Sequence, residues 1–419
     1  MAVIWAKKTG SWNVVTDDGH IWMWHNPDTN TNEEYIVDGV RKLPGVGDTV
    51  YCNGYTITYT GGIDLGNGWL RNDPNEDYGI VGGGRINYGA NAGMSITANC
   101  YAHESVLIYS YSTSGTATYS ITITGNCVAP ASASAGVINS NGNTSTGRRY
   151  VYVTGNVDCS RGGSLMYNCG LGLFVVTGNV ILGDGTFFHL VGNYLNSSTI
   201  TGKLSCTDGS TGYLCNLFIN TSQTLKIGEV DFLNGSPILF AGANAIAHYI
   251  NITGDLKVSN NVSSQQAASI TVGGNVYSNR GYWGAPSANL TVGGTLTQIS
   301  RSWLGSNSAQ TRVNGDIYLL EGARLQTYCA TFILGGNLHT AGHNTPLGCV
   351  TGTFTVPDDF KVFYEENADP YVHLFSRYQL DNTEEYPAES DVRKDVPYAY
   401  GVKKGSLDVN TNIINIYKR

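Results

Sequence analysis

The chain has 419 residues, of which only 13% are charged, and its formal net charge is −8 at pH 7. This acidic balance, without a basic stripe, argues against a nucleic-acid-binding scaffold. The opening MAVIWAKKTGSW has no apolar core of signal-peptide length, and no window approaches the roughly 18 apolar residues of a membrane span, so we expect neither.

Residues 1–98 are expected to form a β-rich N-terminal domain. Four of the seven tryptophans fall within the first 25 positions. The stretch GSWNVVTDDGHIWMWHN resembles a hairpin with its turn at Asp18 and Gly19. The following LPGVGDTVYCNGYTITYTGG is rich in Tyr and Val and predicts a further strand.

Residues 99–356 repeat one short phrase, made of a β-branched or aliphatic residue, a glycine, a small polar residue and then Val, Leu or Ile. We call the glycine of each phrase the anchor glycine. The anchors are Gly125, Gly155, Gly178, Gly202, Gly228, Gly254, Gly274, Gly294, Gly315, Gly336 and Gly352. Their spacing falls mostly within the period that is typical of a solenoid, in which one structural unit recurs along the chain.

The segments between anchors are rich in Val, Ile, Thr and Tyr and show no helical period. They therefore predict an all-β fold, a right-handed parallel β-helix with coils about 4.8 Å apart. From residue 357 to 419 glycine nearly disappears and charged side chains become frequent. We expect this segment to be a small C-terminal cap or docking domain, because a solenoid must cover its last open edge.

Two terminal motifs are similar to those of a known group of proteins. The opening GSW (10–12), followed by LPGVGDTVYCNGYTIT (43–58), resembles a lead-in of virion proteins from tailed phages, many of them crAss-like phages of Bacteroidetes. The stretch YPAESDVRKDVPYAYGVKKGSLDV (386–409) resembles a D-V-R tail motif of phage structural proteins. Its matching positions are Pro387, Asp391, Val392, Arg393, Val396, Tyr398, Gly401, Gly405 and Leu407. Asp395 departs from the pattern, where Gly is usual. The resemblance implies a virion component and marks these positions as a docking motif.

Glu229, Asp255 and Asp231 are the candidate catalytic residues. Glu229 and Asp255 each follow an anchor glycine in consecutive repeats, so in-register coils would stack them about 5 Å apart, near the separation of a retaining glycosidase pair. Asp231 lies two positions along the same strand. The alternative is a column of turn residues, where Asn and Asp are favoured for backbone reasons, and a third reading is a bound cation.

Tyr282, Trp283 and Trp303 are candidate contact residues. The two tryptophans stand one repeat apart in neighbouring repeats, away from the anchors. Aromatic rings at such positions pack a seam between subunits or bind sugar rings, and burial in the core is the third reading.

Metal and thiol chemistry receives little support. His339 and His343 have a spacing that pairs side chains only on a helix, whereas this segment reads as a coil turn. The acidic run from Asp73 to Asp77 lacks the glycine and final glutamate of a calcium loop. The nine cysteines are scattered, so we expect buried free thiols, no metal site and no cofactor.

These observations predict a phage virion structural protein that forms a fibre, spike or decoration of the capsid or tail and is not an enzyme. We expect a homotrimer in the virion, assembled in the host cytoplasm, that binds other virion proteins and contacts host-surface glycan. The alternative is a polysaccharide-degrading tailspike, either a glycoside hydrolase or a lyase. A secreted non-viral adhesin is a third class, which the apparent lack of a signal peptide and the odd cysteine count disfavour.

Overall fold

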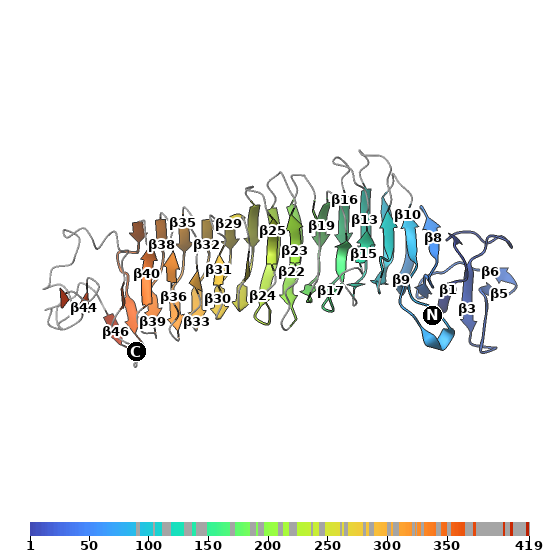
Figure 1. The fold of residues 1–419 in the computed structure, drawn as a ribbon, viewed down its shortest axis with the longest axis horizontal. Helices are drawn as coiled ribbons and strands as arrows, with labels where there is room; N and C mark the ends of the chain where they lie inside the picture. The colour runs from blue at the N-terminus through green and yellow to red at the C-terminus, as the bar shows by residue number, and fades with distance from the viewer. Residues whose placement is uncertain are drawn as a thin grey trace. The chain divides into compact units, whose positions relative to one another are not determined.

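The computed structural model describes a chain that is nearly all β, and η1 (Glu76–Tyr78) is the single helical element among the described residues (Figure 1). The chain divides into two compact units: residues 1–223 with 237–244 form unit 1, and residues 224–236 with 245–419 form unit 2. The described residues are 1–88, 93–103, 105–110, 119–129, 136–139, 149–167, 172–184, 190–191, 197–207, 213–217, 224–235, 238–242, 248–259, 262–263, 267–279, 282–284, 289–299, 303–304, 310–320, 323, 325–327, 331–340, 345–349, 353–364, 372–373, 397–398, 403–404 and 416–418.

Unit 1 contains a large, mainly parallel sheet and smaller ones. The strands of the large sheet are β1 (Val3–Ala6), β3 (Trp22–Asn26), β4 (Thr31–Glu34), β7 (Thr49–Tyr51), β9 (Ile63–Arg71), β11 (Met94–Tyr101), β13 (Tyr119–Thr124), β14 (Cys127–Val128), β16 (Arg149–Val153), β17 (Val157–Cys159), β19 (Gly172–Val176), β20 (Val180–Leu182) and β22 (Ser197–Cys206). A second sheet comprises β2 (Gly10–Ser11), β8 (Thr56–Tyr59), β10 (Arg85–Tyr88), β12 (Ile108–Ser110), β15 (Gly136–Asn139) and β18 (Ser164–Tyr167). The remaining strands are β21 (Leu190–Val191), β23 (Tyr213–Leu217) and β25 (Ile238–Gly242), and the hairpin β5 (Ile36–Val37) with β6 (Val40–Arg41).

Unit 2 repeats the same plan. Its main strands are β24 (Thr224–Phe232), β26 (His248–Ile252), β27 (Leu256–Ser259), β29 (Ala267–Val272), β30 (Val276–Asn279), β32 (Asn289–Val292), β33 (Leu296–Ile299), β35 (Gln310–Val313), β36 (Ile317–Leu320), β38 (Thr331–Leu334), β39 (Leu338–Thr340), β41 (Thr353–Thr355), β42 (Val362–Tyr364) and β46 (Ile416–Lys418). The others are β28 (Val262–Ser263), β31 (Tyr282–Gly284), β34 (Trp303–Leu304), β37 (Leu325–Thr327), β40 (Thr345–Cys349), β43 (Val372–His373), β44 (Pro397–Tyr398) and β45 (Lys403–Lys404).

Stacked strands place equivalent residues of successive coils side by side. In unit 1, Ile121 of β13 pairs with Val151 of β16, which pairs with Phe174 of β19, and all three side chains are buried. Because side chains alternate along a strand, every second residue joins this interior column and the others face outward. The expected all-β class and parallel β-solenoid are therefore confirmed.

The Thr-Gly-Asn form of the anchor phrase ties each coil to its neighbours. The Thr177 hydroxyl donates to the Val153 carbonyl of the preceding coil, at 3.4 Å. The Asn156 side-chain oxygen accepts the backbone N–H of Asn179, one coil later, at 2.8 Å. Such side-chain acceptors satisfy turn N–H groups that no strand pairing reaches.

The anchor glycines allow neighbouring coils to approach closely. A Cβ placed on Gly155 would overlap the backbone carbonyl of Gly125, and one on Gly178 would overlap that of Gly155. Glycine is required here because no other residue lacks the Cβ.

The Trp-rich N-terminus covers the first coil. The rings of Trp12 and Trp22 meet edge to face at 4.8 Å, and the Trp22 indole N–H donates to the Trp12 carbonyl at 2.9 Å. Both side chains are buried. The GSW motif therefore supplies a buried plug for the open end of the core.

The strand pairing at this end differs from the expected hairpin. Strand β3 pairs antiparallel with β1 and β4, placing Trp24 opposite Ile4 and Glu33. Gly19 instead closes a tight turn with Thr16. The alternation around the tryptophans marks a strand correctly, but it carries no information about which distant strand pairs with it.

Parallel pairing also begins before the expected boundary at residue 99, because β7 pairs with β9 and β9 with β11. These early coils use a different turn. Asp48 accepts the backbone N–H groups of Ala2 and Gly45, and Asn53 and Gly54 adopt positive φ angles of 53° and 77°. The expected N-terminal domain thus contains the first coils, which lack the anchor phrase by which the repeats are recognised.

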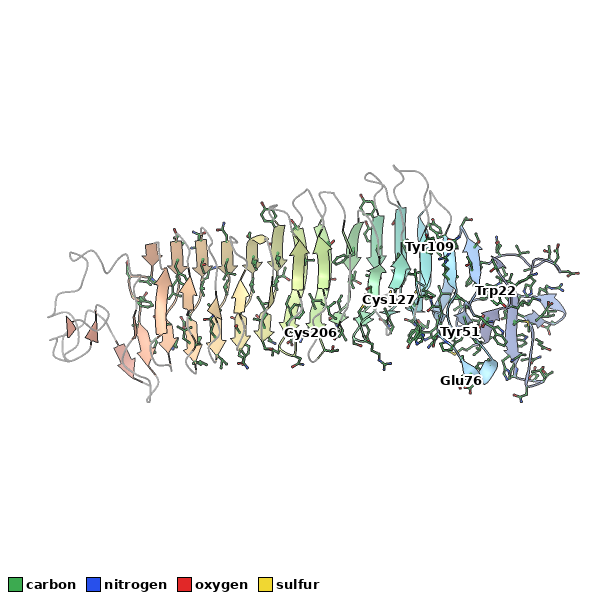
Figure 2. The ribbon with its side chains drawn as sticks, in the orientation of Figure 1. Trp22, Tyr51, Glu76, Tyr109, Cys127 and Cys206 are labelled. Carbon is green, nitrogen blue, oxygen red and sulfur yellow. The ribbon has the colours of Figure 1, made fainter. Side chains whose placement is uncertain are left out.

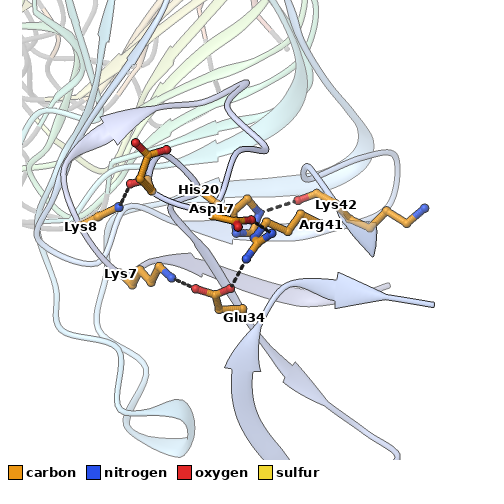
Figure 3. Close-up of polar contacts among 8 residues, drawn as sticks. Lys7, Lys8, Asp17, His20, Glu34, Arg41 and Lys42 are labelled. Atoms are coloured by element: carbon orange, nitrogen blue, oxygen red, sulfur yellow. Dashed lines mark hydrogen bonds and ion pairs between the residues drawn. The ribbon is translucent and has the colours of Figure 1, made fainter. Parts of the chain in front are cut away.

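A network of charged side chains covers the outside of this N-terminal cap (Figure 3). Glu34 lies between Lys7 and Arg41 and forms ion pairs with both, and Arg41 also pairs with Asp17. The hydrogen bond from Lys7 lowers the pKa of Glu34, against the effect of burial. Buried His20 lies beside the network, with its Nε2 atom 3.1 Å from the Lys42 carbonyl.

Candidate functional surfaces

The register of unit 2 brings the candidate acids together. Val230 pairs with Leu256 and Asp231 with Lys257, so Glu229 and Asp255 occupy equivalent positions on neighbouring coils, as the repeat spacing predicts. The Lys257 ammonium lies 3.6 Å from the Glu229 carboxylate.

These carboxylates make local structural contacts. One oxygen of Asp255 accepts the backbone N–H of Asn275, the equivalent residue of the next coil, at 2.7 Å. The Asp231 carboxylate accepts the N–H of Leu233 at 3.4 Å. Asp255 therefore performs the role that Asn156 performs in unit 1, and the turn column accounts for an acid at this position.

We call this column of side-chain acceptors the turn ladder. It begins at Asn99, which follows Ala98 instead of a glycine, and for that reason the anchor phrase did not reveal it. Backbone N–H groups are accepted along it by Asn99, Asn126, Asn156 and Asn179 in unit 1, and by Asp255, Asn275, Asp316 and Asn337 in unit 2.

The candidate contact aromatics lie on neighbouring strands of one small sheet. The backbone of Tyr282 in β31 pairs with Trp303 in β34, and Trp283 pairs with Leu304 and Val262. Trp303 is thus beside Tyr282, one position away from Trp283.

The D-V-R motif lies mostly outside the described residues. Tyr398 belongs to β44, which pairs antiparallel with β45 so that Tyr398 is opposite Lys403. The positions Pro387, Asp391, Val392, Arg393, Gly401 and Gly405 lie outside the described residues, as does His343.

A stack of three rings in unit 2 escaped the sequence reasoning. His339 lies between Tyr318, at 4.3 Å, and Phe363, at 4.7 Å, with the planes nearly parallel. Its Nε2 atom is 2.9 Å from Asp316. The sequence predicted a coil turn at this position, and that prediction was wrong, because His339 belongs to strand β39. The repeat spacing contained part of this signal, because Tyr318 and His339 each stand three positions after an anchor glycine, Gly315 and Gly336. Phe363 does not follow the anchor spacing, and only the strand register places it beside His339.

The electrostatics of this stack favour a charged Asp316. Burial would raise the pKa of the Asp316 carboxyl, but hydrogen bonds from the Asn337 N–H and from His339 outweigh it, and the pKa lies below its ordinary value. The three stacked rings come from successive coils, so their contacts join these coils.

A second aromatic cluster surrounds Arg71 in unit 1. Its guanidinium lies 4.3 Å from the centre of the Tyr101 ring and 5.5 Å from that of Tyr51, which Figure 2 labels. Asp73 binds the same guanidinium through two hydrogen bonds of 2.8 and 2.5 Å. The first acid of the run from Asp73 to Asp77 is thus engaged by an arginine.

The described cysteine side chains are free and buried, as expected; they are Cys52, Cys100, Cys127, Cys159 and Cys206, and Figure 2 labels two of them. Burial raises the pKa of Cys52 and Cys159, and a hydrogen bond with Cys100 together with burial raises that of Cys127. Within the described part of the chain, no group of three His, Cys, Asp or Glu is arranged to hold a metal, and no helix is long and apolar enough to cross a membrane.

Comparison with known proteins adds no relative: no protein-family model, curated protein or solved structure matches this chain.

Proposed function

We propose that this chain is a structural protein of a tailed-phage virion, forming a fibre, spike or decoration as a homotrimer. The two terminal motifs support the virion assignment by resemblance. A parallel β-solenoid is compatible with a shaft and does not by itself identify one.

One observation favours a structural role over an enzymatic role. The candidate acids have structural partners: the Asp255 carboxylate accepts the Asn275 N–H as part of the turn ladder, and the Glu229 carboxylate forms an ion pair with Lys257. A retaining glycosidase needs two carboxylates, one that acts as nucleophile and one that acts as acid and base. The same ladder continues through asparagines, which have no such chemistry.

The enzymatic alternative has a direct test. Purified full-length protein is incubated with capsular polysaccharides from Bacteroidetes hosts, and the polymer length is followed by size-exclusion chromatography. We expect no shortening by the wild type. Shortening that is lost in Glu229→Ala or Asp255→Ala, and retained in the matched ladder variant Asn275→Ala, would establish a depolymerase and remove our proposal.

The virion assignment has an independent test. Antibodies against the purified protein are applied to particles of the phage whose genome encodes this chain, and immunogold labelling is scored by electron microscopy. We expect gold at one repeated location on the particle. Particles that are unlabelled and that contain no peptide of the chain by mass spectrometry contradict the proposal.

A further inference from the structure

The second sheet of unit 1 carries a single charged side chain. Its six strands, β2, β8, β10, β12, β15 and β18, contain no Asp or Glu, and Arg85 in β10 is their only Lys or Arg. The chain as a whole has more acids than bases, 32 against 24. A cation on a sheet without carboxylates attracts anions, because no acid of the same sheet neutralises it.

Arg85 shares the outward face of this sheet with a row of polar side chains. The inward side of the row is formed by three fully buried isoleucines that pair in register, namely Ile57 of β8, Ile86 of β10 and Ile108 of β12. Side chains alternate along a strand, so the next residues, Thr58, Asn87 and Tyr109, face outward and are also in register. Arg85 is two positions before Asn87 and therefore lies on the same face.

An aromatic ring, and not an acid, holds the Arg85 guanidinium. This group lies 4.3 Å from the centre of the Tyr109 ring, which Figure 2 labels. The Arg85 side chain is exposed, and its guanidinium has neither an ion pair nor a hydrogen bond within the described part of the chain. By contrast, the stacked guanidinium of Arg71 is bound by Asp73. Arg85 thus retains its N–H donors, in the planar geometry that pairs with a carboxylate.

Asn87 provides a second unsatisfied group on this face. Its Oδ1 atom is shielded from solvent and accepts no hydrogen bond from the residues that the structure describes. The side chain as a whole is half-buried, so a small rotation of its amide presents this oxygen to a ligand. Thr58, its in-register neighbour, has an exposed side chain. A ligand with hydroxyl groups near a carboxylate would satisfy Asn87 and Arg85 together.

We propose that the outward face of β8, β10 and β12 binds an acidic polysaccharide, with a sugar carboxylate on Arg85 and sugar hydroxyl groups on Thr58 and Asn87. This inference rests on the proposed function, in which the protein contacts host-surface glycan, and it names the site and the charge of that glycan. The strands are about 4.8 Å apart, close to the length of one sugar unit, so a polysaccharide that crosses them can place successive sugars on successive strands.

The composition of the face favours a polysaccharide over an acidic peptide. The outward side chains of the three strands carry hydroxyl, amide, phenol and guanidinium groups and no aliphatic side chain; they are Thr56, Thr58, Arg85, Asn87 and Tyr109. Peptides bind mainly by burying a few apolar side chains in matching pockets, whereas this row offers hydrogen-bond partners for a hydroxyl-rich chain.

The experiment measures the affinity of the full-length protein for three purified polysaccharides. Polygalacturonate supplies carboxylates, dextran sulfate supplies sulfates, and dextran supplies hydroxyl groups without charge. Binding is followed by biolayer interferometry, and circular dichroism confirms that each variant is folded. Arg85→Gln removes the proposed contact. The matched control is Arg312→Gln, which removes an exposed arginine of unit 2 that is hydrogen-bonded to Asn314.

We expect the wild type to bind polygalacturonate more tightly than dextran sulfate, and dextran most weakly. Arg85→Gln should raise the dissociation constant for polygalacturonate by about tenfold or more, because charge-assisted hydrogen bonds to the carboxylate are lost. Arg312→Gln should leave this constant unchanged.

Three results overturn the inference. The first is a wild type that does not bind polygalacturonate or that prefers dextran sulfate. The second is an unchanged affinity of Arg85→Gln, which places the binding elsewhere. The third is an equal loss in Arg85→Gln and Arg312→Gln, which indicates attraction by overall charge. The virion assignment fails separately: Arg85-dependent binding by a protein that is absent from phage particles keeps this site and removes the assignment.

Discussion

At the scale of single residues, the repeated phrase works as a set of three backbone contacts. The threonine donates to the preceding coil, the glycine leaves room for that coil, and the asparagine accepts from the following one. Each contact involves backbone groups at the turn between two strands of a coil. The same chemistry explains why Asp255 and Asp316 can replace asparagine, since a carboxylate oxygen accepts the same N–H.

Asn156→Ala tests the turn ladder. The change removes the acceptor for the Asn179 N–H, and we expect a loss of about 1 kcal/mol in the free energy of unfolding. Asn156→Asp keeps an oxygen in place and should retain most of the stability. Urea unfolding followed by fluorescence measures both, and equal losses would show that the acceptor is unimportant.

Gly155→Ala tests the close approach of coils. The added methyl group would overlap the Gly125 carbonyl, which belongs to the backbone and cannot move aside cheaply, so we expect a loss of about 2 kcal/mol. Gly45→Ala is the matched control, because a Cβ there meets nothing within 4 Å. Thermal unfolding gives the melting temperature of both variants. Comparable melting temperatures would count against the close packing of Gly155 on Gly125.

Asp316 should make stability depend on pH in the acid range. Its pKa in the fold is below the ordinary value of 3.8, so the folded chain binds the proton less tightly than the unfolded chain. The stabilisation is therefore present above that value and is lost as pH falls through the folded pKa. The contribution should be about 1 kcal/mol or less, because the side chain is 29% exposed.

The measurement compares wild type with Asp316→Asn by chemical unfolding at several pH values between about 7 and 3. Asparagine retains an acceptor for the Asn337 N–H but has no charge. The stability difference between the two proteins should shrink as the solution becomes more acidic. A difference that is constant over this range would exclude the carboxylate charge as its cause.

At the scale of elements, strands inside and outside the repeat differ in what determines their pairing partners. Parallel strands of successive coils pair because the repeat spacing brings them into register, as β29 and β32 do with four residue pairs. The N-terminal strands lie outside the repeat; β3 pairs antiparallel with β1 and β4, and Trp22 at its start packs against Trp12.

Trp22→Ala tests the N-terminal plug. The side chain is fully buried, so its removal should cost about 3–5 kcal/mol, partly through the cavity and partly through the lost hydrogen bond to Trp12. Trp22→Phe keeps a ring and should cost clearly less. Denaturant unfolding with proteolysis of the N-terminal residues follows both variants. A small effect of the alanine variant would mean that the cap is independent of the coils.

At the scale of the whole molecule, the interior of the coils is inaccessible without opening the fold. The described cysteines are at most 8% exposed, and their positions inside stacked strands mean that a reagent reaches them only after coils separate. A buried thiol with a raised pKa is also a poor nucleophile.

Thiol labelling tests this protection. Native protein treated with a maleimide at mildly alkaline pH should leave Cys52, Cys100, Cys127, Cys159 and Cys206 unmodified, as mapped by peptide mass spectrometry. The same treatment in guanidinium should label all five. Rapid native labelling of Cys127 or Cys159 would show that the coils of unit 1 open readily.

The sequence by itself determined the solenoid, its parallel strands and the turn column. These follow from a short-range rule, in which an apolar residue, a glycine and a small polar residue recur in successive repeats from Gly125 onward. It also placed Glu229 beside Asp255, because register follows directly from the spacing of Gly228 and Gly254.

The features that lie outside the repeated phrase were determined only by the tertiary structure. The plug of Trp12 and Trp22, the early coils closed by Asp48 and Asn53, and the ring stack around His339 depend on contacts between coils that differ in sequence. The offset between Trp283 and Trp303 arose because the coil that joins these strands is one position longer than the spacing of the two tryptophans, which brings Tyr282 opposite Trp303. Strand register depends on the length of the connecting coil, which composition and residue spacing alone do not reveal.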